Sequence, residues 1–168
     1  MKKHPATLPI DELLKGCQLQ RMRRSGPGGQ HRNKVETAVI ATHLSSGVQA
    51  EANERRSPEQ NRQVALFRLR LNLALQIRTQ PILKNSPSLL WQERCNNRRV
   101  KVNSHHDDFP TLLAEILDLL SLFDWSANKT AEHLQCSMSQ LIKFLKQESR
   151  AFAMLNTHRK EQGLSLLK

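Results

Sequence analysis

The chain is poor in cysteine, and its few cysteines are scattered. Cys17, Cys95 and Cys136 are odd in number, lie far apart and include no Cys-x-x-Cys pair. A disulfide framework needs paired cysteines, and a structural zinc site needs cysteines at short spacing. The sequence therefore predicts neither a disulfide scaffold nor a metal site, and it favours a reducing compartment.

Long apolar runs are also missing. Residues 1–9 include two lysines but no apolar stretch long enough for a secretory signal. No segment approaches the ~18 apolar residues of a membrane span. An Arg- and Ser-rich amphipathic leader is absent as well. We therefore expect a cytoplasmic protein that does not associate with a membrane.

The residue sets that usually carry chemistry are a third absence. The sequence has no Ser/His/Asp set and no metal-ligand cluster. It also lacks G-x-x-x-x-G-K-[ST] and G-x-G-x-x-G, the two glycine patterns that cradle nucleotide phosphates. Any catalysis must then rely on placement and on backbone dipoles, and no cofactor is expected.

Positive charge is abundant, but it is unevenly spread. The 168 residues carry a formal net charge of +11, and this length suits one domain or two small ones. Residues 15–103 hold 17 Lys and Arg against 5 Asp and Glu, whereas residues 104–168 hold 7 against 8. A basic block beside a near-neutral segment predicts a polyanionic partner for the first part only. The alternative is a generic charge that keeps the protein in solution.

A glycine-rich segment lies inside the basic block. Residues 25–34 read Ser-Gly-Pro-Gly-Gly-Gln-His-Arg-Asn-Lys. Glycine admits positive φ and close backbone approach, and proline fixes its own φ. We expect such a loop to hold the Gln30 backbone N–H and side-chain amide at an exposed tip that enters a phosphate-rich place. The alternative is an ordinary solvated turn. The flanking cations are Arg21, Arg23, Arg24, Arg32 and Lys34.

The first half of the chain is predicted to be an α+β unit. Residues 17–24, 37–44 and 48–52 have the patterns of strands, and the last two should form an antiparallel hairpin. A long helix follows, with Ser57 as its cap, Pro58 at the first helical position and Gln60 at the reciprocal capping position. It should end near Pro81. We therefore expect a small antiparallel sheet with one long helix across it.

Residues 81–108 change character. Two prolines and the run Arg98-Arg99-Val100-Lys101 predict an extended basic connector, with Trp91 pinned to a core. The run His105-His106-Asp107-Asp108 suggests a metal site at first sight. Consecutive residues cannot all face one ion in a regular element, so we favour a solvated loop that caps the next helix.

Residues 109–168 are predicted to form three helices. An apolar stripe runs from Leu112 to Phe123, and a short helix covers residues 128–134. A third helix, capped by Ser137, is expected to reach Leu155, with Glu148 interrupting its otherwise apolar face. This order resembles a helix-turn-helix, although Gln135 stands where a turn glycine is usual. The net charge of the segment does not favour binding to DNA phosphates. A small packing or protein-contact module is the favoured alternative.

Several motifs together carry a family resemblance. Residues 24–34, then Thr37-Ala38-Val39, Glu54-Arg55-Arg56-Ser57 and Asn61-Arg62, resemble the catalytic domain of class I peptide chain release factors. That family has a Gly-Gly-Gln loop followed by His-x-Asn-Lys/Thr, a strand pair and an Arg-Ser-x-x-x-Asn-Arg-like helix start. The likeness covers residues 15–80, about half of the chain. It implies a Gly-Gly-Gln catalytic domain at 1–80. The patterns that follow predict a basic linker at 81–108 and a C-terminal helical domain at 109–168.

The resemblance also implies an activity. Class I release factors insert this loop into the ribosomal peptidyl-transferase centre, where the peptidyl-tRNA ester is hydrolysed. By that likeness Gly28, Gly29 and Gln30 would be the catalytic tip. One backbone N–H aimed at the oxyanion of the tetrahedral intermediate can contribute on the order of 10²–10³ in rate. The expected partners are large-subunit rRNA and peptidyl-tRNA. Glutamines at this position are commonly N5-methylated in the family, which implies that a glutamine methyltransferase modifies Gln30.

The residues around the tip have supporting roles in this hypothesis. Cations near the loop and near the start of the long helix would contact rRNA or tRNA phosphates, which fix position without reading sequence. Solvated charge is the equal alternative for any single one. The expected RNA-contacting residues are Arg21, Arg23, Arg24, Arg32, Lys34, Arg55, Arg56 and Arg62, with Asn61 beside them. The expected loop-shaping residues are Ser25, Gly26, Pro27, His31 and Asn33, and His31 is favoured as a shaping residue over a general base.

One departure from the family decides the expected mode of action. Codon-reading members have extra domains with a tripeptide that recognises the stop codon, whereas only a short stretch precedes the first strand here. This predicts codon-independent release, as in the short rescue-type relatives. Those relatives commonly end in a strongly basic tail, but residues 157–162 are only mildly basic. Residues 94–101 or the helical unit are the candidates to replace it. The alternative function is a ribosome- or RNA-binding protein, or a helix-turn-helix regulator, without hydrolase activity.

Overall fold

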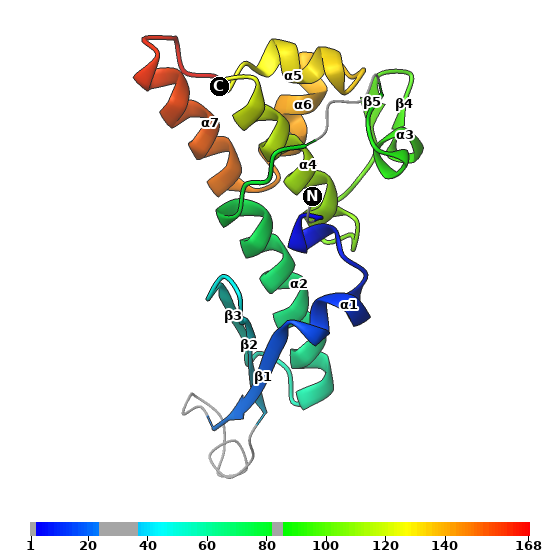
Figure 1. Cartoon of the computed structure of the whole chain (residues 1–168), viewed down its shortest axis with the longest axis vertical. Coiled ribbons are helices and arrows are strands. Elements are labelled where there is room, and N and C mark those ends of the chain that lie inside the picture. The colour runs from blue at the N-terminus through cyan, green and yellow to red at the C-terminus, as the bar shows by residue number, and fades with distance from the viewer. Residues whose placement is uncertain (1–2, 24–36, 82–85) are drawn as a thin grey trace. The chain divides into compact units, whose positions relative to one another are not determined.

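In the computed structural model, which describes residues 3–23, 37–81 and 86–168, small apolar residues build a three-stranded antiparallel sheet. The strands β1 (Cys17–Met22), β2 (Ala38–His43) and β3 (Gln49–Ala52) lie in the order β1-β2-β3 (Figure 1). Met22 pairs with Ala38 and Val39 pairs with Ala52. The predicted β2–β3 hairpin is confirmed, and β1 is added as the second edge strand.

The first strand contributes pairing more than core. Every residue of β1 after Cys17 is exposed, including Leu19 and Met22 at 37% and 38% of their surfaces. The long helix α2 (Pro58–Gln76) instead packs against β2 and β3. The core of this unit therefore lies between α2 and those two strands, and β1 is held through its backbone ladder with β2.

The start of α2 agrees with the sequence, whereas its end does not. The Gln60 N–H donates to Ser57 Oγ at 3.4 Å, so Ser57 caps the helix as predicted. Leu66, Leu69 and Leu73 are buried along one face. The helix ends at Gln76, earlier than Pro81. Beyond it the Thr79 N–H donates to Asp118 Oδ1 at 3.0 Å, a contact that replaces helical hydrogen bonding.

Two short helices precede the sheet. They are η1 (Pro5–Thr7) and α1 (Ile10–Lys15). The first packs on α2, where the Arg70 guanidinium donates to the Ala6 carbonyl at 3.2 Å. Residues 1–76 form one compact unit on this basis, and residues 77–168 form a second.

The second unit is mixed but mainly helical. It contains α3 (Leu89–Arg94), β4 (Cys95–Asn96), β5 (Arg99–Val100), α4 (Phe109–Leu122), α5 (Ala127–His133), α6 (Met138–Leu145) and α7 (Ser149–Glu161). Residues 86–108 thus differ from the extended connector that the sequence predicts. Trp91 is 1% exposed, and its Nε1–H donates to the Leu134 carbonyl at 2.7 Å. The expectation that Trp91 is pinned to a core is confirmed.

The core of the second unit centres on α4. Ten of its fourteen residues are buried. The rings of Phe109 and Phe144 stack at 4.7 Å, and Trp91 lies 6.2 Å from Phe144. Aromatic side chains therefore join α3, α4 and α6, which leaves residues 86–108 firmly packed.

The third predicted helix is two helices. The chain leaves helical geometry after Leu145, and Glu148 adopts extended φ and ψ of −122° and 101°. Its Oε1 accepts from the Arg150 N–H at 3.1 Å and so caps α7. The prediction of one continuous helix from Ser137 to Leu155 was wrong, because Glu148 caps a new helix and does not merely interrupt an apolar face.

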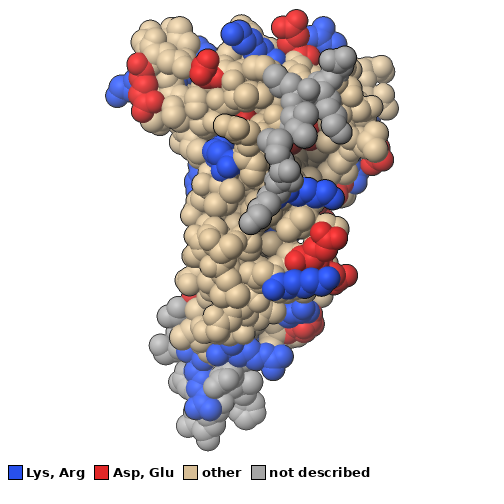
Figure 2. Space-filling view, in the orientation of Figure 1, with Lys and Arg blue, Asp and Glu red and all other residues tan. Residues whose placement is uncertain are grey.

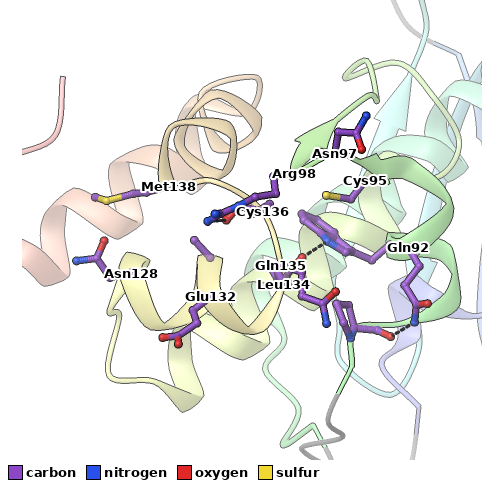
Figure 3. A pocket seen from close by; sticks show the side chains of 13 residues that line it. Gln92, Cys95, Asn97, Arg98, Asn128, Glu132, Leu134, Gln135, Cys136 and Met138 are labelled. Carbon is purple, nitrogen blue, oxygen red and sulfur yellow. Dashed lines mark hydrogen bonds between the residues drawn. The ribbon is translucent and has the colours of Figure 1, made fainter.

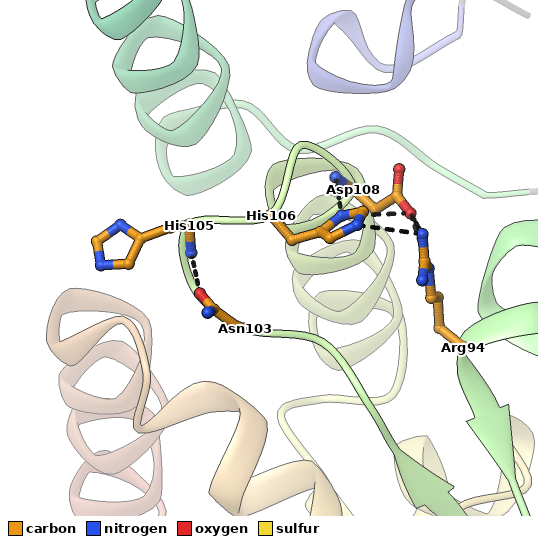
Figure 4. A network of polar contacts seen from close by, with 5 residues as sticks. All are labelled: Arg94, Asn103, His105, His106 and Asp108. Carbon is orange, nitrogen blue, oxygen red and sulfur yellow. Dashed lines mark hydrogen bonds and ion pairs between the residues drawn. The ribbon is translucent and has the colours of Figure 1, made fainter.

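The loop before α4 is organised by Arg94. Arg94 Nε donates to Asp108 Oδ2 at 2.8 Å, and Arg94 Nη2 lies 3.3 Å from His106 Nε2 (Figure 4). Asp108 precedes α4 but its carboxylate makes no cap hydrogen bond. The His105 ring points away from the others. Within the described residues no group of three His, Cys, Asp or Glu side chains could hold a metal ion.

The pair of Glu148 and Arg150 predicts a pH dependence. The Arg150 hydrogen bond lowers the pKa of Glu148 below the ordinary value of a glutamate, while burial opposes the change. The carboxylate therefore contributes stability above that value and loses it as pH falls through the lowered pKa. Glu148→Gln should cost about 1 kcal/mol near neutral pH, typical of a cap, and the cost should shrink on acidification from pH ~4.5. Thermal unfolding against pH measures this.

The control for this experiment is Glu132→Gln, an exposed carboxylate on α5. Its effect on the unfolding midpoint should stay the same across the pH series. A Glu148→Gln offset that is equally insensitive to pH would contradict the assigned role of the Arg150 pair.

No helix among the described residues is long and apolar enough to cross a membrane.

Candidate functional site

The predicted catalytic tip lies outside the described residues. The residues concerned are Arg24, Ser25, Gly26, Pro27, Gly28, Gly29, Gln30, His31, Arg32, Asn33 and Lys34. Their roles stay predictions. The structure does describe the two points at which this segment joins the sheet, and these points carry several of the predicted residues.

The two ends of the segment are held next to each other. β1 and β2 pair up to Met22 and Ala38, so the chain leaves the sheet at Arg23 and returns at Thr37. β2 is anchored in turn, because Ala38, Val39 and Ala41 are at most 2% exposed beneath α2. The ladder and the helix therefore give the segment a fixed base.

Asn61 fastens this base to α2. Its Nδ2 donates to the Thr37 carbonyl at 2.7 Å and to the Arg55 carbonyl at 2.9 Å. Its Oδ1 accepts from the Arg55 N–H at 2.9 Å. The side chain is 0% exposed. The predicted contact between Asn61 and rRNA is therefore wrong, because its amide is fully used inside the protein.

The sequence contained a signal for this role. Asn61, Ala65, Leu69 and Leu73 recur at intervals of four, and all four are buried. A polar residue on the apolar face of a helix needs an internal partner, since burying an unpaired amide is costly. Identifying those partners required the fold, because Thr37 lies 24 positions earlier in the chain.

The bend between β3 and α2 presents Arg55 and Arg56. Both side chains are exposed, and Asn61 holds both the N–H and the carbonyl of Arg55. Glu54 is engaged elsewhere. It is ion-paired with Arg68, which also donates to the Glu51 carbonyl at 2.8 Å. Among the described residues neither Arg55 nor Arg56 pairs with a carboxylate, so their charge is available to a polyanion.

The pKa of Glu54 agrees with this pairing. Its burial alone would raise the pKa, but the hydrogen bond from Arg68 and the backbone N–H groups bring it below the ordinary value. The carboxylate therefore stays ionised, and Arg68 neutralises its charge. Because the pair is about half exposed, it contributes little to stability.

The remaining predicted cations divide into two groups. Arg21 on β1 and Arg23 just beyond it are exposed at the base of the segment. Arg62 differs, because its Nη1 lies 3.0 Å from Glu59 Oε1 in an i,i+3 ion pair. Figure 2 shows Lys and Arg side chains gathered at this end of the first unit. The structure thus brings Arg21, Arg23, Arg55 and Arg56 to the base and leaves Arg62 partly neutralised.

A serine–histidine contact exists elsewhere in this unit, but it belongs to a turn. His43 Nδ1 lies 2.7 Å from Ser46 Oγ in the turn between β2 and β3. Burial lowers the pKa of His43. His43 ends β2, whereas the segment joins the other end at Ala38, roughly 17 Å away at ~3.4 Å per residue. The pair therefore closes the β2–β3 turn, which Gly47 completes at a φ of 71°.

The described base can position a loop and attract phosphates. Rigid backbone at Thr37 and Arg55, with the exposed guanidinium groups of Arg55 and Arg56 beside it, favours contact with an RNA backbone. Among the described residues of this unit we find no nucleophile held by a base near the segment. The chemistry of the site thus depends on what residues 24–36 carry.

Comparison with known proteins identifies related chains. The family model described as RF-1 domain matches residues 10–108. Peptide chain release factor 1 of Xylella fastidiosa (strain 9a5c) is 29% identical over 148 residues, which are 88% of this chain and 37% of that protein. A peptide chain release factor homolog of Escherichia coli (strain ATCC 25922) is 38% identical over 95 residues, 56% of this chain and 44% of that protein. Peptide chain release factor 1 of Rickettsia typhi is 30% identical over 92 residues, 55% of this chain and 26% of that protein. The chain spans less than half the length of each of these relatives.

Proposed function

The chain belongs to the RF-1 domain family of class I release-factor-like proteins, and from this premise we propose that it hydrolyses the peptidyl-tRNA ester on the ribosome. The observation that supports this most is the cationic base of the segment 24–36. The ladder at Met22 and Ala38 and the Asn61 hydrogen bonds hold that base rigid. The segment between its ends carries the Gly-Gly-Gln sequence.

In the proposed reaction water attacks the ester carbonyl carbon that links the nascent peptide to tRNA. The Gln30 backbone N–H stabilises the oxyanion that forms, and the Gln30 side-chain amide holds the water. Collapse of the intermediate breaks the bond to the tRNA ribose oxygen, which leaves with a proton. Gly28 and Gly29 allow the backbone to approach because they carry no side chain.

The neighbours of the tip position it. Ser25, Gly26, Pro27, His31 and Asn33 shape the loop in this scheme, and Gln30 is the target of a glutamine methyltransferase. The cations Arg21, Arg23, Arg24, Arg32, Lys34, Arg55 and Arg56 contact rRNA or tRNA phosphates. Arg62 contributes less than these because Glu59 neutralises it.

We propose further that release needs no codon and serves stalled ribosomes in the cytoplasm. The packing and the charge of the C-terminal part of the chain support this. Residues 109–168 are used to build a packed helical core, and residues 104–168 carry a slight excess of acidic groups. Such a segment offers little attraction to the RNA of a decoding site. In this scheme residues 1–80 are the catalytic domain, residues 81–108 a basic segment that packs with the helices after it, and residues 109–168 a helical domain.

Release of labelled peptide tests the proposal. Ribosomes carrying peptidyl-tRNA and an empty A site are prepared with mRNA that ends at, or continues past, the decoding site. The full chain should release peptide whether the exposed codon is stop, sense or missing. Release that requires a stop codon would contradict codon independence. Cosedimentation with ribosomes but no release from any complex would favour the alternative, a ribosome- or RNA-binding protein without hydrolase activity.

A further inference from the structure

Residues other than glycine with left-handed backbone cluster in the second unit. Among the described residues five have positive φ without being glycine, and three of these line one hollow. They are Asn97 at 48°, Arg98 at 62° and Gln135 at 52°. Glycine would accept these angles with less strain. Asn97 and Arg98 form the two-residue turn between β4 and β5, where positive φ is usual. Gln135 follows the C-cap of α5, another usual place for positive φ. The two turns meet at one hollow.

The hollow has a volume of about 800 Å³ and is walled by three elements. One wall is α3, the second is the β4–β5 hairpin, and the third is the turn between α5 and α6 (Figure 3). The bond from Trp91 Nε1 to the Leu134 carbonyl, at 2.7 Å, joins the first wall to the third. The Ser137 N–H donates to the Arg98 carbonyl at 3.3 Å and joins the second wall to the third. The hollow is therefore preformed.

The lining combines an apolar floor with many amide groups. Leu134 and Cys136 are buried there, and burial raises the pKa of the Cys136 thiol to about 11, so the thiol stays neutral. The polar side chains around the floor are Gln92, Asn97, Arg98, Asn128, Glu132 and Gln135. Amide side chains both donate and accept hydrogen bonds. A flat apolar molecule with donors and acceptors on its edge, such as a nucleobase, fits such a lining.

A second hollow adjoins the first and shares Asn97 with it. It has a volume of about 400 Å³ and is lined by Asn96, Asn97, Arg99 and Lys101, all of them polar. Within the described part of the chain neither Arg99 nor Lys101 pairs with a carboxylate. By contrast Arg94 and Arg150 of the same unit are ion-paired with Asp108 and Glu148. Two exposed cations beside a base-sized hollow suit a phosphodiester.

We propose that this pair of hollows binds single-stranded RNA, with one unstacked base in the larger hollow and phosphates on Arg99 and Lys101. A stacked duplex cannot present a base to a hollow, whereas single-stranded RNA can splay one out. The choice of RNA as the nucleic acid rests on the proposed function. The site itself shares no residue with the Gly-Gly-Gln tip, so it can be tested apart from hydrolysis.

Glycine substitutions at two of the positive-φ positions test the site without unfolding it. Arg98→Gly and Gln135→Gly remove side chains that line the larger hollow, and they place glycine where φ is already positive. The thermal unfolding midpoint should stay equal or rise. The affinity of the full chain for a short fluorescein-labelled single-stranded RNA should fall about tenfold. This is the loss of affinity expected when one charged or hydrogen-bonding contact is removed.

Asp124→Gly is the matched control. Asp124 has a φ of 50° and does not line either hollow. Its midpoint should also stay equal or rise, but RNA affinity should not fall. Unchanged affinity in both Arg98→Gly and Gln135→Gly would overturn the proposal, as would equally tight binding of a duplex RNA of the same length.

Charge variants test the phosphate contacts. Arg99→Ser with Lys101→Ser should lower the slope of log affinity against log salt by about 1.4, since each contact to a single strand contributes ~0.7. The control pair, Lys160→Ser with Lys168→Ser, removes the same charge from exposed positions of the same unit and should leave the slope unchanged. An equal loss in both pairs would indicate unspecific attraction and overturn the proposal.

Crosslinking locates the bound RNA, since the first unit is cationic as well. An RNA that contains 4-thiouridine should crosslink to peptides within residues 86–103 or 127–140. Crosslinks confined to residues 3–62 would overturn the proposal. Gln30→Ala should leave these crosslinks intact while it slows peptide release, so a failure of the second-unit site and a failure of the hydrolase function are told apart.

Discussion

Replacing Gly28 and Gly29 together by alanine should slow peptide release by a factor on the order of 10²–10³. Methyl groups at these positions would keep the Gln30 N–H away from the ester oxygen, and loss of one aimed oxyanion donor has that effect. The measurement is the single-turnover rate of release at saturating protein. The sheet and α2 are built without these residues, so the unfolding midpoint should not change.

Gln30→Ala completes this prediction. The backbone donor remains, but the amide that holds the water is lost, and release should slow on the order of 10²-fold, as misplacement of a reactant does. Cosedimentation with ribosomes should be unaffected. The control is Arg55→Ser with Arg56→Ser at the base of the segment. These changes should raise the protein concentration needed for half-maximal release and leave the saturated rate nearly the same. Undiminished release by the double alanine variant would contradict the mechanism.

Asn61→Ala should strongly destabilise the first unit. The change leaves the Arg55 N–H and the Thr37 and Arg55 carbonyls without their partner. Each buried unsatisfied group costs about 1–3 kcal/mol, and partial access to water reduces the sum, so we expect a loss of about 3 kcal/mol. The unfolding midpoint of this unit should fall by roughly 12–24 °C, at about 4–8 °C per kcal/mol for a unit of this size. Hydrogen exchange should show the loss in residues 37–61.

The same variant should impair release beyond its effect on stability. Asn61 is a positioning residue, because it ties the return end of the segment to the bend that carries Arg55 and Arg56. Asn61→Asp keeps the acceptor for the Arg55 N–H but loses both donors, so it should not restore the rate at low temperature, where the protein is folded. Gln63→Ala, an exposed change on the same helix, is the control. Equal midpoints for Asn61→Ala and Gln63→Ala would refute the role of the amide.

Local rules were sufficient for the start of α2 and for the strands. The cap at Ser57 acts over three residues, and the alternation of Val48, Ala50 and Ala52 reports on one face of one strand. The RF-1 domain match also agrees with the family resemblance read from the motifs around residues 24–62. These features depend on neighbours in the chain, so a sequence displays them directly.

Longer-range contacts account for the differences. Residues 86–108 looked like a connector because their prolines and arginines are locally typical of one. Trp91 nevertheless finds a carbonyl 43 positions away, and Phe109 finds Phe144, so the segment is packed. The break before α7 also needed the structure, because a glutamate in an apolar stripe is equally compatible with a kink, a partner or a cap.

The sequence alone determined the family of this protein, the cationic surroundings of its Gly-Gly-Gln segment, and the strands and the start of the long helix of its first unit. These follow from composition, from short motifs and from hydrogen bonds within a few residues. Only the tertiary structure decided that Asn61 is an internal clamp and that Asn97, Arg98 and Gln135 meet around one hollow. The physical reason is that the burial of a polar side chain and the meeting of two separate turns depend on residues distant in the chain, which no local pattern records.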